Sequence, residues 1–153
     1  HMRSTVHSVS PWNFEGWGTN WTLPTTASVA PQSCRMLGAD RDGPSVHKTI
    51  QNATQSEVSV QAIQCDVRHL TPAHFEDCPE SGLILCNPPY GIGSGRRTDA
   101  VYHWLGETWR NHFSNWRLYF IATDGHKAAL VSESAEYVTE FSNAGIKVGF
   151  FKG

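Results

Sequence analysis

Apolar residues fall into short runs that alternate with amphipathic segments from about residue 35 onward. Four runs have the length and composition of strands: CRMLGAD at 34–40, VSVQAIQCD at 58–66, LILC at 83–86 and RLYFIA at 117–122. The LILC run is apolar at every position, which is typical of a central parallel strand that helices cover on both faces.

Three further segments carry helical signals. Asp42 and Pro44 supply a cap and a first turn ahead of apolar residues at helical spacing. Asp99 is placed to cap a second helix, and residues 124–134 predict a third. The second helix has one apolar stripe, made of Val101, Trp104, Leu105, Trp109 and Phe113. Strands that alternate with helices predict a right-handed, mostly parallel α/β sheet.

The last segment of the chain predicts a different kind of strand pairing. Residues 136–151 hold two strand-like stretches around Asn143-Ala144-Gly145, whose glycine suits a short turn. We therefore expect the mostly parallel sheet to end in a C-terminal antiparallel hairpin.

The first part of the chain shows neither helical nor strand periodicity. It carries three Trp and three Pro within residues 1–33, and only TVHSV at 5–9 alternates like a strand. His1 and Met2 resemble a vector-derived remnant. The pattern predicts an irregular N-terminal segment over 1–33 and an α/β domain over 34–153.

Composition narrows the range of partners. Twelve basic and fourteen acidic residues give a net charge of −2, so any nucleic acid must bind a local basic patch. No apolar run approaches the ~20 residues of a membrane span, and no signal peptide is evident, which favours a soluble, cytoplasmic protein. The four cysteines form no C-x-x-C pair, and we expect no metal site.

Polar residues follow three of the predicted strands at the point where each strand ends. They are Asp40, Asp66 and Asn87. In an open α/β sheet, ligands bind beyond the carboxyl ends of the strands. A carboxylate there can accept hydrogen bonds from ribose hydroxyls or from an adenine amino group, although Asp is also common as a cap or turn residue. All three residues are candidates for one binding crevice.

Asn87-Pro88-Pro89-Tyr90 is the most specific motif in the chain. The prolines fix φ and remove backbone donors, which leaves a stiff shelf rich in carbonyl acceptors. The Asn87 side-chain oxygen and the Pro88 carbonyl could hold the two hydrogens of an exocyclic amine and direct its lone pair toward an electrophile. Tyr90 offers a flat face on which a base can stack. The motif predicts transfer to a base amine, and the alternative is an ordinary Pro-rich turn.

The loop that follows, GIGSG at 91–95, lacks the Lys-Ser/Thr of a phosphate-binding P-loop. We interpret it as a substrate loop. Arg96 and Arg97 come directly after it and are candidates for contact with an RNA backbone. The alternative for these two arginines is a solvated pair ahead of a helix.

The LILCNPPYG stretch resembles motif IV of amino-directed, S-adenosylmethionine-dependent nucleic-acid methyltransferases. The wider pattern resembles the bacterial RNA guanine-N2 methyltransferases that often carry a THUMP domain, from about Trp12 to Phe151. It consists of LGADRD, QNAT, QCDVRHLTP, NPPYG, WRLYFIATDG and SNAG. This resemblance implies a Rossmann-like fold, S-adenosylmethionine as cofactor and RNA as partner. It places Asp40 on the cofactor ribose, Asp66 on the adenine, and Asn87 to Tyr90 at the target amine.

One departure from the family pattern is a missing D-x-x-C-G-S-G-T type glycine loop, together with the strand before it. We therefore expect weak cofactor binding and a gap in the sheet between the 34–40 and 83–86 strands. Residues 5–9 or a second copy of the chain, as a homodimer, would fill the gap. The alternatives are an inactive, truncated domain with a structural or binding role, and a methyltransferase that acts on adenine or glutamine.

Overall fold

The computed structural model describes residues 35–89, 95–143 and 145–153. The chain divides into two units, residues 1–34 and 35–153, and the fold below is that of the second unit. TVHSV, Tyr90 and residues 91–94 lie outside the described residues, and the side chains of Arg96 and Arg97 are not described.

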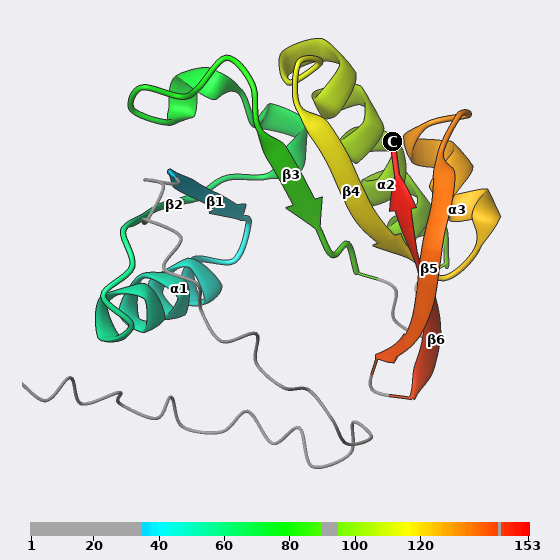
Figure 1. Cartoon of the computed structure of the whole chain (residues 1–153), viewed down its shortest axis with the longest axis horizontal. Helices are drawn as coiled ribbons and strands as arrows, with labels where there is room; N and C mark the ends of the chain where they lie inside the picture. Colours follow the sequence, from blue (N-terminus) through cyan, green and yellow to red (C-terminus); the bar gives the residue numbers. More distant parts are fainter. Residues whose placement is uncertain (1–34, 90–94, 144) are drawn as a thin grey trace, which may run out of the picture. The chain divides into compact units, whose positions relative to one another are not determined.

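The second unit begins with a parallel βαβ arrangement (Figure 1). Strand β1 (Met36–Asp40) pairs in parallel with β2 (Val60–Gln64), and helix α1 (Gly43–Gln55) connects them. The predicted cap of α1 is present, because an Asp42 carboxylate oxygen accepts a hydrogen bond from the Ser45 N–H at 2.9 Å. Two short 3-10 helices follow, η1 (Val67–His69) and η2 (Pro72–His74).

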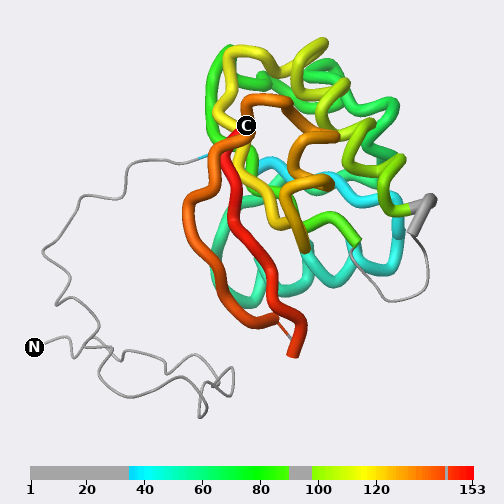
Figure 2. Tube along the Cα trace, turned by 90° about the vertical axis from the view of Figure 1, so that its right-hand side faces the viewer, coloured from blue at the N-terminus to red at the C-terminus, as the bar shows by residue number. Residues whose placement is uncertain are grey.

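The rest of the unit forms a four-stranded sheet in the order β3-β4-β6-β5. Strands β3 and β4 are parallel, whereas β6 pairs antiparallel with both β4 and β5. The elements are β3 (Leu83–Cys86), α2 (Gly95–His112), β4 (Arg117–Ala122), α3 (Gly125–Val131), β5 (Glu136–Asn143) and β6 (Ile146–Lys152). The strands of the hairpin run side by side in Figure 1 and in the turned view of Figure 2. The predicted α/β fold with a C-terminal antiparallel hairpin is confirmed.

Two local predictions were wrong. Helix α2 begins at Gly95 instead of being capped by Asp99, which lies inside the helix with its carboxylate 3.7 Å from the Lys127 Nζ. Strand β3 is an edge strand of its sheet and not a central one, because β4 is its only partner among the described residues. Leu83 and Leu85 alternate with the core-facing Ile84 and Cys86, and they are exposed, at 46% and 69%.

The core lies between β4 and the two helices α2 and α3. Leu118, Phe120 and Ala122 alternate along β4, and all three are fully buried on one face of the sheet. Tyr102 of α2 and Val131 of α3 pack against that face. The Tyr102 hydroxyl also donates a hydrogen bond to the Ile121 carbonyl at 3.2 Å, which ties α2 to β4.

A substitution at Gly106 of α2 tests how closely α2 and α3 approach each other. Gly→Ala inside a helix usually stabilises a protein, but a Cβ at this position would overlap the backbone carbonyl of Val131. We expect Gly106→Ala to lower the free energy of unfolding by roughly 1–3 kcal/mol in urea titrations. Gly125→Ala is the matched control, because a Cβ there meets no atom within 4 Å. Equal stability of the two variants would show that the helices do not touch as described.

Candidate active site at the strand ends

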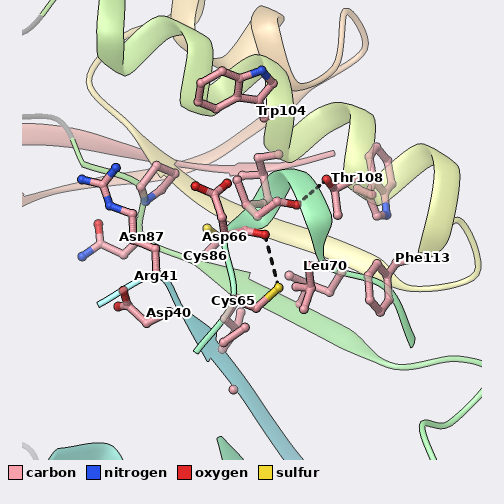
Figure 3. A pocket seen from close by; sticks show the side chains of 18 of the residues that line it. Asp40, Arg41, Cys65, Asp66, Leu70, Cys86, Asn87, Trp104, Thr108 and Phe113 are labelled. Carbon is pink, nitrogen blue, oxygen red and sulfur yellow. Dashed lines mark hydrogen bonds between the residues drawn. The ribbon is translucent and has the colours of Figure 1, made fainter. Parts of the chain in front are cut away.

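The carboxyl ends of β1, β2 and β3 open onto one cavity of about 440 Å³ (Figure 3). The cavity is lined by Asp40 at the end of β1, Asp66 just beyond β2, and Asn87, Pro88 and Pro89 after β3. The structure therefore brings together all the candidate cofactor and shelf residues whose positions it describes. Asn87 and Pro89 are exposed but Pro88 is buried, so only part of the expected shelf is open.

Asp66 has a well-defined set of partners. Its carboxylate accepts the Arg68 N–H at 3.0 Å and also pairs with the Arg68 guanidinium, Nε to Oδ1 at 2.9 Å and Nη2 to Oδ2 at 3.0 Å. These hydrogen bonds from Arg68 lower the pKa of Asp66 to about 2. Asp66 is thus a fixed anion at neutral pH, which can accept hydrogen bonds from a ligand but cannot donate one.

Arg68 is itself held by α2. Its guanidinium lies over the Trp104 ring, 4.6 Å from the centroid, and the Thr108 hydroxyl donates to the Val67 carbonyl at 2.7 Å. Trp104 and Thr108 are one helical turn apart, so one face of α2 holds η1 and, through it, the Asp66 carboxylate. Sequence reasoning missed the roles of Arg68 and Thr108. The only signal was the Asp-x-Arg spacing beyond a strand.

Asp40 lies in a more open environment than Asp66. One of its carboxylate oxygens accepts the Asp42 N–H at 2.8 Å, which fixes the turn between β1 and α1, and the residue is exposed. The neighbouring Asp42 carboxylate is engaged in capping α1. Asp40 therefore presents a carboxylate at the mouth of the cavity, where it can accept hydrogen bonds from hydroxyl groups.

Cys86 lies directly before Asn87 and lines the same cavity. Burial raises the pKa of its thiol to about 11, so the group is neutral near pH 7. A neutral thiol is a poor nucleophile. Cys86 is therefore poorly suited to act as a covalent nucleophile.

No group of three or more His, Cys, Asp or Glu side chains in the described part of the chain is arranged to bind a metal ion. None of the helices described has the length and hydropathy needed to cross a bilayer.

The mixed sheet with its C-terminal hairpin has the α/β fold of methyltransferases. Residues 9–148 match the RMKL-like methyltransferase domain family (UPF0020), and the chain belongs to that family. It is 28% identical over 147 residues to the ribosomal RNA large subunit methyltransferase K/L of Psychromonas ingrahamii. The aligned region covers 88% of this chain and 20% of that protein. The protein of the same name from Syntrophotalea carbinolica is 33% identical over 87 residues, 54% of this chain and 12% of that protein. The chain thus spans only 12–20% of the length of these relatives.

Solved structures support the same fold. A possible methylase from Clostridium difficile 630 superposes with a TM-score of 0.65 at 24% identity, over 79% of this chain and 32% of that one. The structure of SMU.472, a putative methyltransferase complexed with SAH, superposes with a TM-score of 0.60 at 22% identity, over 76% of this chain and 30% of that one. At these identities, the similarity to the two solved structures supports the fold alone.

The Arg68–Asp66 pair can be tested by titration. Arg68→Met should raise the pKa of Asp66 from about 2 toward its ordinary value of 3.8, because the variant loses the guanidinium hydrogen bonds. The folded pKa of Asp66 is depressed, so its ionised form stabilises the fold above about pH 4, and this contribution is lost as the pH falls toward 2. Carboxyl NMR titration measures the shift directly.

Arg68→Lys is the matched control, because it keeps the charge but loses the planar fork and the stacking on Trp104. We expect an intermediate pKa for Asp66 in this variant. An unchanged pKa in Arg68→Met would contradict the assignment of the pair.

Proposed function

We propose that this domain transfers a methyl group from S-adenosylmethionine to the N2 amine of guanine in ribosomal RNA. The observation that carries the proposal is the single cavity onto which Asp40, Asp66 and Asn87 open from three different strands. Membership of the RMKL-like methyltransferase family and the ribosomal RNA methyltransferase relatives support it.

The two acids suit the adenosine part of the cofactor. Asp40, exposed at the end of β1, would accept hydrogen bonds from the ribose hydroxyls. Asp66, kept ionised by Arg68, would accept a hydrogen bond from the adenine amino group. The carboxylate still has acceptor capacity beyond its bonds to Arg68, since an ionised carboxylate offers about four lone-pair sites. S-adenosylmethionine supplies an electrophilic methyl group on a positively charged sulfur.

Asn87 would bind and orient the base amine, which is the nucleophile. Its side-chain oxygen and the Pro88 carbonyl would accept the two amine hydrogens and turn the nitrogen lone pair toward the methyl carbon. The amine nitrogen would form the new N–C bond as the methyl–sulfur bond breaks with its electron pair left on sulfur, and the amine would then release one proton to solvent. Tyr90, which lies outside the described residues, is proposed to stack on the base.

RNA is the proposed substrate. Arg96 and Arg97 begin α2 shortly after the shelf and are proposed to bind the RNA backbone. Such a local contact suits a chain whose net charge is −2. Asn-Pro-Pro-Tyr also suits adenine or glutamine amines, and these remain the rival substrates to be distinguished by experiment.

The cofactor roles predict a specific loss of binding. In calorimetric titration of S-adenosylmethionine, we expect weak 1:1 binding to the 153-residue chain. Asp40→Asn and Asp66→Asn should each weaken it by roughly tenfold or more, because each removes a charged acceptor. Glu133→Gln, an exposed carboxylate beyond α3, is the control and should bind as the parent does. Unchanged affinity in both Asp variants would refute the cofactor assignment.

If Asn87 binds the amine, its substitution should slow methyl transfer and leave cofactor binding unchanged. With unmodified large-subunit ribosomal RNA and methyl-labelled cofactor, Asn87→Ala should slow transfer by about 10²–10³-fold while cofactor affinity is kept. Asn52→Ala on the exposed surface of α1 is the control. Label recovered in N2-methylguanosine would support the proposal, whereas label in adenine, DNA or protein would identify a rival substrate. Absence of label from every substrate would favour the inactive alternative.

A further inference from the structure

A second cavity, of about 400 Å³, lies between the start of α3 and the β5–β6 hairpin. It is lined by residues 123–125, which follow β4, and by residues of both hairpin strands, among them Tyr137, Glu140 and Lys147. None of these residues lines the cavity of the candidate active site. The reaction proposed above therefore leaves the second cavity without a role.

The second cavity lies at the same edge of the four-stranded sheet as Asn87. Strands β3 and β4 are parallel and in register, so Asn87 after β3 and Thr123 after β4 leave the sheet at one edge. The hairpin reaches further in that direction, because the last β4–β6 pair is Ala122 with Gly149 and residues 146–148 of β6 extend beyond it. Figure 1 shows the hairpin running past the ends of β3 and β4. The two cavities are therefore neighbours along one edge of the sheet.

The distance between them suits a strand of nucleic acid. In the sheet order, β6 is separated from β3 by β4 alone. Neighbouring strands are about 4.8 Å apart, so the ends of β3 and β6 are about 10 Å apart. Stacked nucleotides of one strand rise by about 3.4 Å each, so this distance corresponds to about three nucleotides. A base close to the target base in the same strand can reach the second cavity.

Hydrogen bonds fix the wall of the second cavity that follows β4. The Asp124 carboxylate accepts the Lys127 N–H at 2.9 Å and the Thr123 hydroxyl at 3.0 Å. The Lys127 Nζ lies 3.7 Å from the Asp99 carboxylate of α2. Helix α2 begins shortly after the Asn87 shelf, so this ion pair helps to hold the second cavity in a fixed position relative to the shelf.

Tyr137 gives the second cavity an aromatic surface. Its ring meets the ring of Phe151 edge to face, with 5.7 Å between the centroids and 77° between the planes. Phe151 is a buried core residue, whereas Tyr137 is 57% exposed. The core therefore anchors the Tyr137 ring on one side and leaves most of it open. Aromatic rings presented in this way are stacking surfaces for the bases of single-stranded RNA.

The charges of the second cavity suit a base better than a phosphate. The charged residues that line it are Asp124, Glu140 and Lys147, so among the described residues the lining has no excess positive charge. Lys147 Nζ lies 2.8 Å from Glu140 Oε1, and both side chains are exposed. A phosphate would meet two carboxylates there. The polar edge of a base, in contrast, can donate to a carboxylate and accept from an ammonium group.

We propose that the second cavity binds a base of the substrate RNA that lies about three nucleotides from the methylated base. The base stacks on Tyr137 and places its polar edge against Glu140 and Lys147. The inference rests on the proposed function for its ligand, RNA, and adds a contact that holds the strand by stacking instead of by charge. Such a contact suits a chain whose net charge is −2.

Fluorescence anisotropy with a single-stranded RNA of about 12 nucleotides and one central guanine tests the proposal. Tyr137→Ala should weaken binding by roughly five- to hundredfold, because the variant loses the stacking surface. The factor should be the same at about 50 and about 200 mM salt, since a stacked base releases no counterions. Tyr137→Phe keeps the ring and should bind nearly as the parent does. Val138→Ala is the matched control, because Val138 is exposed on the same strand but does not line the cavity.

Photocrosslinking to the parent chain tests the same contact without any variant. Iodouridine placed about three nucleotides from the guanine should crosslink to Tyr137. A crosslink confined to other residues would contradict the proposal.

The outcomes separate this inference from the proposed reaction. Unchanged RNA affinity in Tyr137→Ala would overturn the inference, and so would a loss that shrinks at higher salt, which indicates a phosphate contact. Methyl transfer that requires Asn87 but not Tyr137 would overturn the inference alone and leave the proposed function standing. Binding of RNA that requires Tyr137, without methyl transfer, would support the inference and refute the reaction. A parent chain that binds no RNA would overturn both.

Discussion

The placement of the β1–β2 pair against the four-stranded sheet depends on the packing of η1 against α2. No strand of one sheet pairs with a strand of the other among the described residues. The described polar contacts that connect them are the Thr108 hydroxyl on the Val67 carbonyl and the Arg68 guanidinium over Trp104. Because Asp66 immediately precedes this contact and Asn87 ends β3, the geometry of the candidate site rests on a helix face and not on a continuous sheet.

The four-stranded sheet provides the rigid side of the site. Strand β4 is parallel to β3 and antiparallel to β6, and its buried residues Leu118, Phe120 and Ala122 anchor α2 and α3. This packing fixes the carboxyl end of β3, and with it Asn87, and also fixes the face of α2 that holds η1. One apolar core therefore positions the shelf directly and the Asp66 carboxylate indirectly.

Apolar runs and turn residues were sufficient to predict every strand of the described residues, the cap of α1 and the C-terminal hairpin, because these depend on local pattern. The strand-end rule also predicted that Asp40, Asp66 and Asn87 would gather. The start of α2 was mispredicted because Asp99 is a good cap by residue type, yet the helix extends one turn further and Asp99 pairs with Lys127. The Arg68–Trp104 contact joins residues 36 positions apart and has no periodic signal.

The LILC run has a pattern that predicts a different environment from the one observed. Its four apolar residues fit a strand buried on both faces, but the described residues bury only one face and pair only one edge. The apolar pattern of β3 therefore fits a covered strand better than the position that β3 has among the described residues. No backbone pairing joins β1 and β3 among the described residues, although Asp40 and Asn87 at their ends line one cavity. On the proposed function, Asp40 would hold the ribose and Asn87 the amine, so the alignment of the methyl group between them would depend on how firmly the contact of η1 with α2 holds the two sheets together.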